Sequence, residues 1–326
     1  MIYGNVKFYS RIIHVKTEQS FQTKISFIFL FLGYSIFGFS IMFSKIALNL
    51  TSPFVLIGAR FGVAFLILNI LLIFRKKKLH FKGKKLYNIF LLGLVQPVLY
   101  FICESYGITM LQTSFVGIIL ALIPITSFVF GFFYLKEKVK PIQIVFAIIA
   151  ILGVCLTTIG QSEGQFSWIG FVLILGAVIS AAMFNVLSRK IATEFSAFER
   201  TYIMFFIGFI TFVPIGLIES IGSFQELIII PFQNVQFWIS VVFLAGLSSV
   251  LAFLMINYAM THLEVAKAAI FANLTTVIAI LAGVLFLDEH FGIFQIIGSC
   301  IIVLSVYGVN RFSKKKRTSL NRKASF

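Results

Sequence analysis

The sequence has 326 residues, of which 60% are hydrophobic and only 12% charged, and its mean hydropathy is +1.03. This composition excludes an ordinary soluble globular protein, because such chains carry far fewer apolar and many more charged residues. The formal net charge of +16 would favour nucleic-acid binding in a soluble protein, so its meaning depends on where the charges lie.

Apolar runs of about 20 residues, each long enough to cross a bilayer as a helix, recur along almost the whole chain. They are too long and too continuously apolar for the alternating strands of a membrane barrel. The sequence therefore predicts an all-α integral membrane protein with ten transmembrane helices, at residues 25–48, 54–74, 86–106, 110–134, 142–160, 168–188, 200–219, 235–259, 264–286 and 292–310.

The charged residues predict the orientation of these helices. If the N-terminus is cytoplasmic, 24 of the 27 Lys and Arg fall in inner segments, including the basic segments 1–24 and 311–326. The predicted outer loops instead carry the acidic residues Glu104, Glu163, Glu219, Glu226, Asp288 and Glu289. This asymmetry follows the positive-inside rule and predicts that both termini are cytoplasmic. The membrane itself is expected to be the inner (cell) membrane of a bacterium. The basic charge then forms a cytoplasmic rim beside the lipid bilayer, and we expect no nucleic-acid partner.

An internal repeat appears when the sequence is shifted by 152 residues. The shift aligns "YGITML" at 106–111 with "YAMTHL" at 258–263 without a gap. The connection "YLKEKVKPIQI" at 134–144 falls on "FLDEHFGIFQI" at 286–296 in the same register. We interpret this match as a duplication of a five-helix unit.

An odd number of helices per unit predicts that the second unit enters the membrane from the opposite side, so the repeats are inverted. Two such halves can rock about a site near the middle of the membrane, which is how many secondary transporters alternate access. The lysines at 136, 138 and 140 then hold one connection in the cytoplasm, while its lysine-free duplicate faces outward.

Two stretches carry a resemblance to a known family: "KIALNLTSPFVLIGARFG" across the first two predicted helices and "TSFVGIILALIPITSFVFGFFYLKEKVKPIQIVFAIIAILGV" across the fourth and fifth. With the ten-helix layout, they resemble the EamA-type family of the drug/metabolite transporter superfamily. The positions that fit its pattern are Lys45, Pro53, Arg60, Pro124 and Glu137 in the first half and Ala259, Ala266, Glu289 and Gly298 in the second.

The resemblance covers roughly residues 27 to 310 and implies two EamA-like five-helix halves, at 25–160 and 168–310. It implies a secondary transporter of small organic solutes that exports a metabolite or an amino acid. Import or exchange of a metabolite or nucleotide-like solute, or a passive channel, remains an alternative, and a homodimer is left open. One position departs from the family pattern, because Thr276 stands where the family commonly has a second mid-helix proline.

The third predicted helix offers candidates for the substrate cavity, because polar groups are costly in hydrocarbon unless they have partners or face water. Gln96, Tyr100 and Glu104 are spaced four residues apart and are expected along one helix face. Glu104 is also the candidate for proton coupling, since it is the acid nearest the interior of a span. The alternative is that Gln96 bonds a neighbouring backbone and Glu104 lies in an outer loop.

Other polar residues within the spans are further cavity candidates. We expect these side chains to contact either the substrate or neighbouring helices, because Asn commonly forms hydrogen bonds between helices in bilayers. The residues are Asn185, Asn257, Asn273 and Thr276.

Three cations and a possible hinge complete the candidates. Lys45 and Arg60 are expected to bind an anionic group, to form an internal ion pair, or to snorkel to the membrane surface. Lys267 is expected to snorkel in the same way. Pro124 and Gly131 predict a helix break or hinge in the fourth helix.

Other functional classes find little support in the sequence. The four histidines have no metal-ligand spacing, and no clustered catalytic residues appear, so we expect neither an enzyme nor a bound metal or cofactor. No Walker-type glycine loop is present for ATP-driven pumping. No polar or charged ring typical of a channel stands out.

Overall fold

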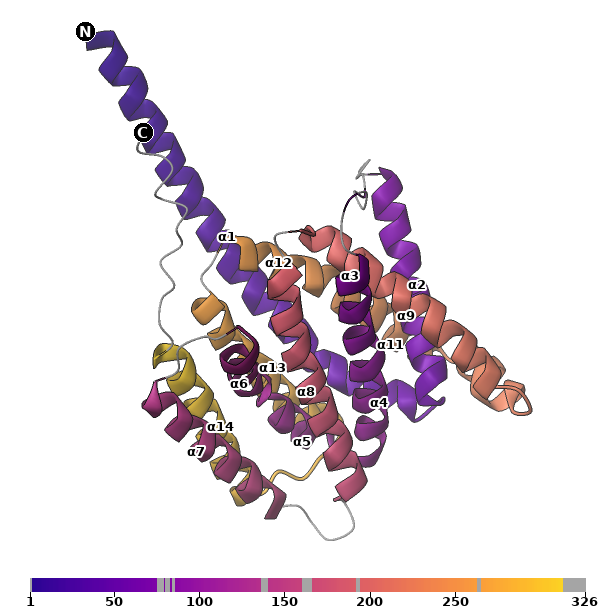
Figure 1. Cartoon of the computed structure of the whole chain (residues 1–326). Helices are drawn as coiled ribbons and strands as arrows, with labels where there is room; N and C mark the ends of the chain where they lie inside the picture. The colour runs from indigo at the N-terminus through magenta and orange to yellow at the C-terminus, as the bar shows by residue number, and fades with distance from the viewer. Residues whose placement is uncertain are drawn as a thin grey trace.

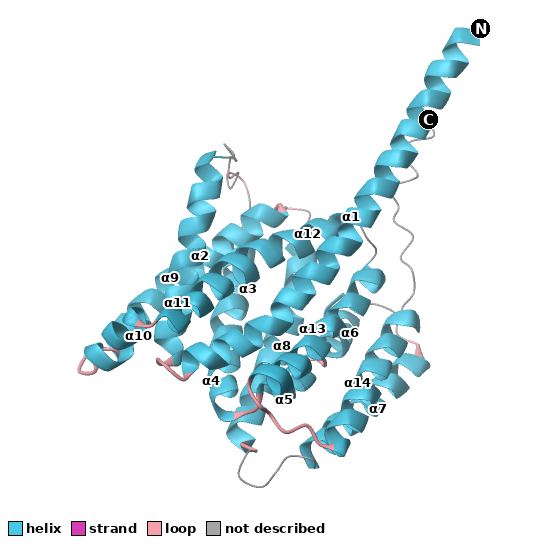
Figure 2. Cartoon of the chain, turned by 180° about the vertical axis from the view of Figure 1, so that it is seen from behind, coloured by secondary structure: helices cyan, strands magenta, loops and turns pink. Residues whose placement is uncertain are grey.

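The computed structural model describes the backbone of residues 2–74, 79, 83, 86–135, 140–159, 166–191, 194–262 and 265–312. Side chains are described in these ranges except at 2–21, 135, 159, 189, 197, 257, 260–262, 265–270, 310 and 312. Every regular element in these ranges is helical (Figures 1 and 2). The elements are α1 (Ile2–Leu48), α2 (Pro53–Phe74), α3 (Leu86–Gly93), η1 (Leu94–Leu99), α4 (Tyr100–Met110), α5 (Thr113–Leu120), α6 (Ile123–Leu135), α7 (Pro141–Ile159), α8 (Trp168–Ile191), α9 (Ala197–Glu219), η2 (Gln225–Ile229), α10 (Ile230–Gln233), α11 (Val235–Val242), η3 (Phe243–Ala252), α12 (Phe253–His262), α13 (Val265–Phe286) and α14 (Ile293–Phe312).

The described residues contain eight helical spans that are long and apolar enough to cross a membrane: Gln22–Leu48, Pro53–Phe74, Leu86–Met110, Thr113–Tyr134, Pro141–Thr158, Trp168–Ser188, Phe198–Glu219 and Val235–Ile256. Two shorter apolar helices, Phe271–Phe286 and Ile293–Val309, follow where the ninth and tenth spans are predicted. The prediction of a helical membrane protein is confirmed. Helices suit this setting because each satisfies its own backbone groups where no water is available.

The third span continues further than predicted. We predicted that it ends near residue 106 and left an outer-loop position for Glu104 as the alternative, but α4 runs on to Met110. Glu104 therefore lies inside a helix and is only 6% exposed. The alternative of a loop position is wrong, because a single Glu can remain in an apolar helix when neighbouring groups compensate its burial.

The helices pack through close backbone approaches and buried aromatic rings. Gly58 of α2 lies against the backbone of Phe212 in α9, and a Cβ at Gly208 would collide with the ring of Phe61. Phe61 and Phe212 are both buried, with ring centroids 5.5 Å apart. Small residues let membrane helices approach closely enough for such packing.

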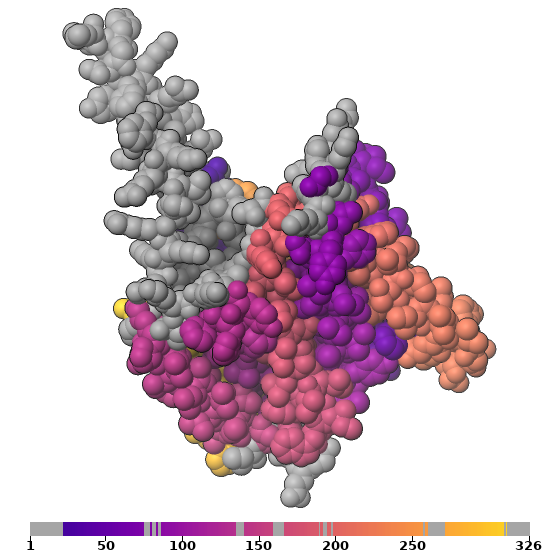
Figure 3. Space-filling model, in the orientation of Figure 1, coloured from indigo at the N-terminus to yellow at the C-terminus, as the bar shows by residue number. Residues whose placement is uncertain are grey.

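Apolar side chains also cover the outside of the bundle, as expected for surfaces in contact with lipid. In the space-filling view, the magenta surface of α7 and the pink surface of α8 lie on one visible face, with the orange segment after α9 at the opposite edge (Figure 3). Leu152 of α7 and Val172 of α8 are among the large apolar residues exposed on these helices. Exposed apolar residues of this kind are stable in a bilayer, and buried polar ones become the informative exceptions.

Three spans are interrupted. η1 divides the third span, and at Gln96 the backbone leaves the helical region, with φ −142° and ψ 115°. η3 forms ten residues of π-helix within the eighth span. The fourth span is broken by turn residues 121 and 122, so that α5 ends before them and α6 begins with Ile123 and Pro124. Departures from regular α-helix of this kind are frequent at functional sites.

Candidate solute-binding site

A buried arginine joins the second and eighth spans. Arg60 of α2 is 5% exposed, and its Nε donates a hydrogen bond to Ser249 Oγ at 2.9 Å. Its Nη2 donates to Ser248 Oγ at 3.3 Å. Both serines belong to η3 and are fully buried. Snorkelling is therefore wrong for Arg60, because its guanidinium is held inside the bundle by two hydroxyl groups.

The guanidinium of Arg60 also lies over an aromatic ring. Its central carbon is 4.5 Å from the ring centroid of Phe101, which is buried in α4. A cation over the face of an aromatic ring is attracted to the negative potential of that face, most strongly where water is excluded. Phe101 therefore fixes the Arg60 charge on the side facing α4.

A buried carboxylate stands on the same helix. The hydroxyl of Tyr100 donates to Glu104 Oε1 at 2.8 Å, one helical turn away. This contact realises the predicted four-residue spacing between Tyr100 and Glu104. The charges of Glu104 and Arg60 interact electrostatically. Opposite charges in a low-dielectric interior attract far more strongly than in water, which offsets part of the cost of burying each.

These side chains form a group that we call the polar cluster: Arg60, Tyr100, Glu104, Ser248 and Ser249. They come from the second, third and eighth spans, and the eighth span is far from the other two in the sequence. Arg60 connects them, because it binds both serines and interacts with Phe101 and Glu104 of α4. A guanidinium can only donate hydrogen bonds, and an ionised carboxylate can only accept them. The cluster therefore places a guanidinium, which donates hydrogen bonds, and a carboxyl group, which accepts them when it is ionised, within one buried region.

Gln96 does not continue the face formed by Tyr100 and Glu104. The prediction of one continuous face was wrong, because the extended backbone at Gln96 breaks the four-residue register. Gln96 is buried, and the hydroxyl of Ser180 in α8 donates to the neighbouring carbonyl of Val95 at 2.6 Å. Ser180 thus satisfies a backbone group near the interruption.

The remaining polar candidates lie apart from the polar cluster in their described contacts. Asn185 Nδ2 of α8 donates to Ser127 Oγ of α6 at 3.0 Å, which is a contact between helices. Thr276 of α13 donates to the carbonyl of Gly117 in α5 at 3.1 Å. Asn273 is buried, and its Oδ1 has no hydrogen-bond partner among the described residues.

Two further predicted residues lie outside the described side chains. These are Asn257 and Lys267, so the structure does not place their side chains relative to the polar cluster.

The other predicted elements of the site are helix ends and breaks. Pro124 is the second residue of α6, directly after the break in the fourth span, and Gly131 is a buried residue of the same helix. Lys45 donates to the carbonyls of Ile108 and Leu111 at 2.7 and 3.0 Å. Its ammonium group therefore binds the end of α4.

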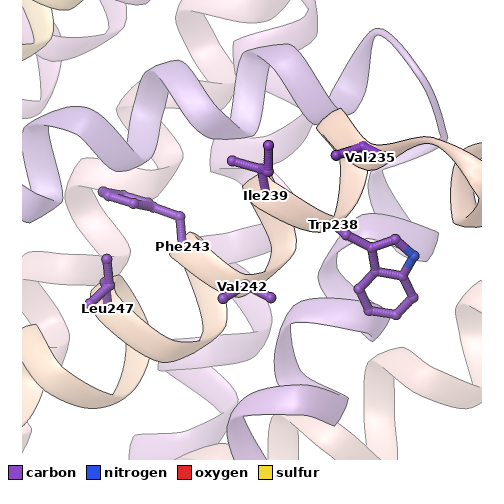
Figure 4. A pocket seen from close by; sticks show the side chains of 6 residues that line it. All are labelled: Val235, Trp238, Ile239, Val242, Phe243 and Leu247. Carbon is purple, nitrogen blue, oxygen red and sulfur yellow. The ribbon is translucent and has the colours of Figure 1, made fainter.

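An apolar groove on the surface is separate from the polar cluster. It has a volume of about 440 Å³ and is lined by Val235, Trp238, Ile239, Val242, Phe243 and Leu247 (Figure 4). These side chains belong to α11 and η3, and most of them are exposed. Their exposure and apolar character are typical of a surface in contact with lipid, so the groove is not a candidate for binding a polar solute.

The fold and the buried charges can be compared with known proteins. The EamA-like transporter family model matches this chain twice, over residues 24–159 and 168–311. The chain belongs to the EamA-like transporter family. The resemblance inferred from the sequence is confirmed, and the protein is a transporter of this family.

Relatives of this EamA-like transporter cover most of its length. It is 32% identical over 288 residues to "Uncharacterized transporter YcxC" of Bacillus subtilis (strain 168), covering 86% of this chain and 91% of that protein. It is 24% identical to an "Uncharacterized transporter" of Archaeoglobus fulgidus, covering 82% and 92%. A solved structure matches with a TM-score of 0.61 at 17% identity, covering 90% of this chain and 98% of the other, which supports the fold alone.

Sequence reasoning missed Ser248 and Ser249, the two hydroxyls that bind Arg60. The 152-residue shift held a usable signal, because it aligns Ser248 with Gln96, a residue already predicted to line the cavity. Small hydroxyl residues are common in membrane helices, so composition alone did not distinguish them.

Proposed function

We propose that this EamA-like protein is a secondary transporter that binds a small organic solute at the polar cluster and carries it across the membrane by alternating access. The observation that carries the proposal is the burial of Arg60 and Glu104, on two spans of the first repeat, with Arg60 held by two serines of the second. Buried charges are costly and are retained in membrane proteins mainly for function. A site whose contacts cross between the repeats changes when the repeats move against each other.

The arrangement of helices supports ten spans in two inverted repeats. η1 covers residues 94–99, and the 152-residue shift moves this range to 246–251, inside η3. Both repeats therefore interrupt the same span at the same place. Departures from α-helix at equivalent positions favour a pair of related units placed around a common site.

The packing of α7 against α14 supports the same interpretation. The Cβ position of Gly153 approaches the carbonyl of Gly298, while Gly308 lies against the ring of Phe146. Phe146, near the beginning of α7, contacts Gly308 near the end of α14, whereas Gly153, later in α7, contacts Gly298, earlier in α14. The two helices therefore run antiparallel. Antiparallel packing is expected for equivalent helices of inverted repeats.

The transported solute is proposed to be a metabolite or amino acid that carries both charges. A carboxylate or other acceptor group would bind the guanidinium of Arg60 and the serine hydroxyls, and an ammonium or donor group would bind Glu104. We propose export as the direction, with the termini in the cytoplasm and the chain in a bacterial cell membrane. Import or exchange through the same site is the alternative that a direction-resolved flux assay distinguishes.

Glu104 is proposed to couple transport to a proton gradient. A carboxyl group that sits in the pathway can bind a proton on one side of the membrane and release it on the other as its surroundings alternate. Tyr100 already provides a hydrogen-bond partner that can orient this group. The solute and the proton would then compete or cooperate at the same carboxylate.

The proposal is tested with purified protein in proteoliposomes, using a panel of amino acids, nucleobases and cationic dyes with and without a pH gradient. We expect saturable flux of at least one solute, which Glu104→Gln uncouples from the pH gradient. Glu219→Gln is the matched control, because Glu219 ends α9 and bonds Ser52 away from the polar cluster. Gradient-dependent flux that survives in Glu104→Gln would refute the coupling role.

A further inference from the structure

The turn between α4 and α5 is held by charged side chains that come from two other parts of the chain. Only Leu111 and Gln112 separate the two helices, and both have extended backbone angles. Helix ends leave backbone carbonyls or N–H groups without partners inside the helix. Gln112, at the N-cap of α5, makes no side-chain capping bond, so the beginning of that helix needs another partner.

Lys45 binds the end of α4. It lies in the last turn of α1, and its Nζ donates to the carbonyls of Ile108 at 2.7 Å and Leu111 at 3.0 Å. The C-terminus of a helix carries partial negative charge, which a lysine ammonium stabilises. The first span is thereby attached to the turn through a cation.

Glu289 binds the beginning of α5. Its two carboxylate oxygens accept hydrogen bonds from the backbone N–H groups of Thr113 and Ser114, the second at 2.8 Å. The N-terminus of a helix carries partial positive charge, so a carboxylate is the favourable group there. Glu289 lies in the connection between α13 and α14, so its contact ties the second repeat to the same turn.

The sequence around Glu289 is shaped for this contact. The N–H groups of Leu287 and Glu289 both donate to the carbonyl of Gly283, which folds the chain back after α13. A Cβ on Gly283 would collide with the carboxylate of Glu289. Asp288 adopts a positive φ of 52°, which Asp tolerates better than most residues and which completes the reversal.

The two side chains also act on each other. Lys45 and Glu289 interact electrostatically, so the cation on one side of the turn and the anion on the other reinforce one another. The views from front and back both place the connection between α13 and α14 at the end of the bundle opposite the N-terminus (Figures 1 and 2). The turn directly follows α4, the helix that carries Tyr100 and Glu104.

We propose that Lys45 and Glu289 form a latch that holds the transporter closed on the face opposite the N-terminus, and that this latch opens when the solute pathway opens to that face. The latch joins the first span, the α4–α5 turn and the connection between α13 and α14. Separation of the repeats on this face must break the bonds of Glu289 to Thr113 and Ser114. This inference goes beyond the proposed function, because it concerns the conformational equilibrium and needs no knowledge of the solute.

The test measures how fast a buried reporter reacts with a membrane-impermeant maleimide. In a variant whose Cys103, Cys155 and Cys300 are replaced by alanine, Ser114→Cys introduces a single thiol at a site that is 1% exposed. This substitution leaves the backbone N–H that Glu289 binds. Right-side-out and inside-out vesicles are labelled separately, so that the reactive face is identified without assuming the topology.

We expect Glu289→Gln to label about tenfold faster than the parent from the face opposite the N-terminus, because losing a charged hydrogen-bond partner favours the open state by about that factor. Glu219→Gln is a matched substitution at the end of α9, where the carboxylate accepts a hydrogen bond from Ser52 and not from the turn, and it should label at the parent rate. An unchanged rate in Glu289→Gln from both faces would overturn the proposal.

A second set of variants keeps the test decisive if Glu289→Gln fails to fold. Gly283→Ala displaces the carboxylate of Glu289 without changing any charge, so it should also accelerate labelling. Gly62→Ala is the control and should not accelerate labelling, because its Cβ would make only an ordinary van der Waals contact. A second reporter, Ser305→Cys, lies buried in α14 and should stay protected. Faster labelling at both reporter thiols would indicate general unfolding and would overturn the latch. A labelling rate in Gly283→Ala equal to that of the parent would also overturn it.

Discussion

Gln143 and Gln295, which are 152 residues apart, make the same hydrogen bond at the beginnings of two different helices. Gln143 Oε1 accepts from the N–H of Lys140 at 3.0 Å, and Gln295 Oε1 accepts from the N–H of Gly292. In each case the third residue of a helix reaches back to the residue just before it, which is one half of a capping box. Equivalent residues thus begin α7 and α14 in the same way.

The first prediction concerns the membrane side of these two connections. If the five-helix units are inverted, reporter fusions after Lys140 and after His290 will report opposite sides of the membrane. A fusion after Phe312 should report the same side as the one after Lys140, because both follow inner ends of spans. Alkaline phosphatase and green fluorescent protein fusions measure this directly. Reports from one common side at 140 and 290 would rule out inverted repeats.

The second prediction concerns the charge of Arg60. Arg60→Ala should abolish saturable solute flux and lower the free energy of unfolding by about 3 kcal/mol, because it removes the electrostatic partner of Glu104 and leaves two buried hydroxyls without their donor. Unfolding by increasing dodecyl sulfate in mixed micelles measures the second effect.

Arg60→Lys separates charge from geometry in the same experiment. A lysine keeps the positive charge but lacks the planar fork that reaches Ser248 and Ser249 together. We expect it to recover part of the stability but little of the flux. Full flux in Arg60→Lys would show that only the charge matters, and normal flux in Arg60→Ala would remove Arg60 from the site.

The third prediction concerns the hydrogen bond between Tyr100 and Glu104. In a double-mutant cycle, Tyr100→Phe and Glu104→Gln should show a coupling energy of about 1–3 kcal/mol in unfolding free energy, because each change removes the same charged hydrogen bond. The pair Tyr202→Phe and Glu104→Gln is the control, since the hydroxyl of Tyr202 bonds Asn69 and not Glu104. Strict additivity for Tyr100 and Glu104 would mean that their bond contributes nothing to stability.

Most of the fold was predictable because a bilayer imposes strong rules on sequence. The predicted spans at 54–74 and 168–188 agree with the observed spans Pro53–Phe74 and Trp168–Ser188 within one residue. Both have Gly, Pro or charged residues at their ends, and such signals are local. The third span was predicted to end at residue 106, four residues before Met110. A loop position was left open for Glu104, because no local pattern shows that Tyr100 and Arg60 lie near enough to compensate its charge.

The candidate site was only partly predictable, because its contacts join residues far apart in the chain. The four-residue spacing identified Tyr100 and Glu104 as neighbours, since helix periodicity alone determines that geometry. The partners of Arg60 are 188 and 189 residues away, and no local pattern indicates them. The break at Gln96 was also invisible, because helical spacing was assumed across a proline that interrupts it.

The fourth prediction concerns the contact between α7 and α14. A Cβ on Gly298 would lie 2.7 Å from the carbonyl of Gly153 and 3.1 Å from the N–H of Thr157, both rigid backbone groups. Gly298→Ala should therefore force the helices apart and destabilise the protein by about 1–3 kcal/mol, as overpacking typically does. Gly246→Ala is the control, because its Cβ would meet only a side-chain carbon at 3.8 Å. Thermal unfolding in detergent should show a lower Tm for Gly298→Ala alone. Equal Tm values for the two variants would mean that α7 and α14 do not pack as closely as described, and the antiparallel pairing that supports inverted repeats would lose its basis.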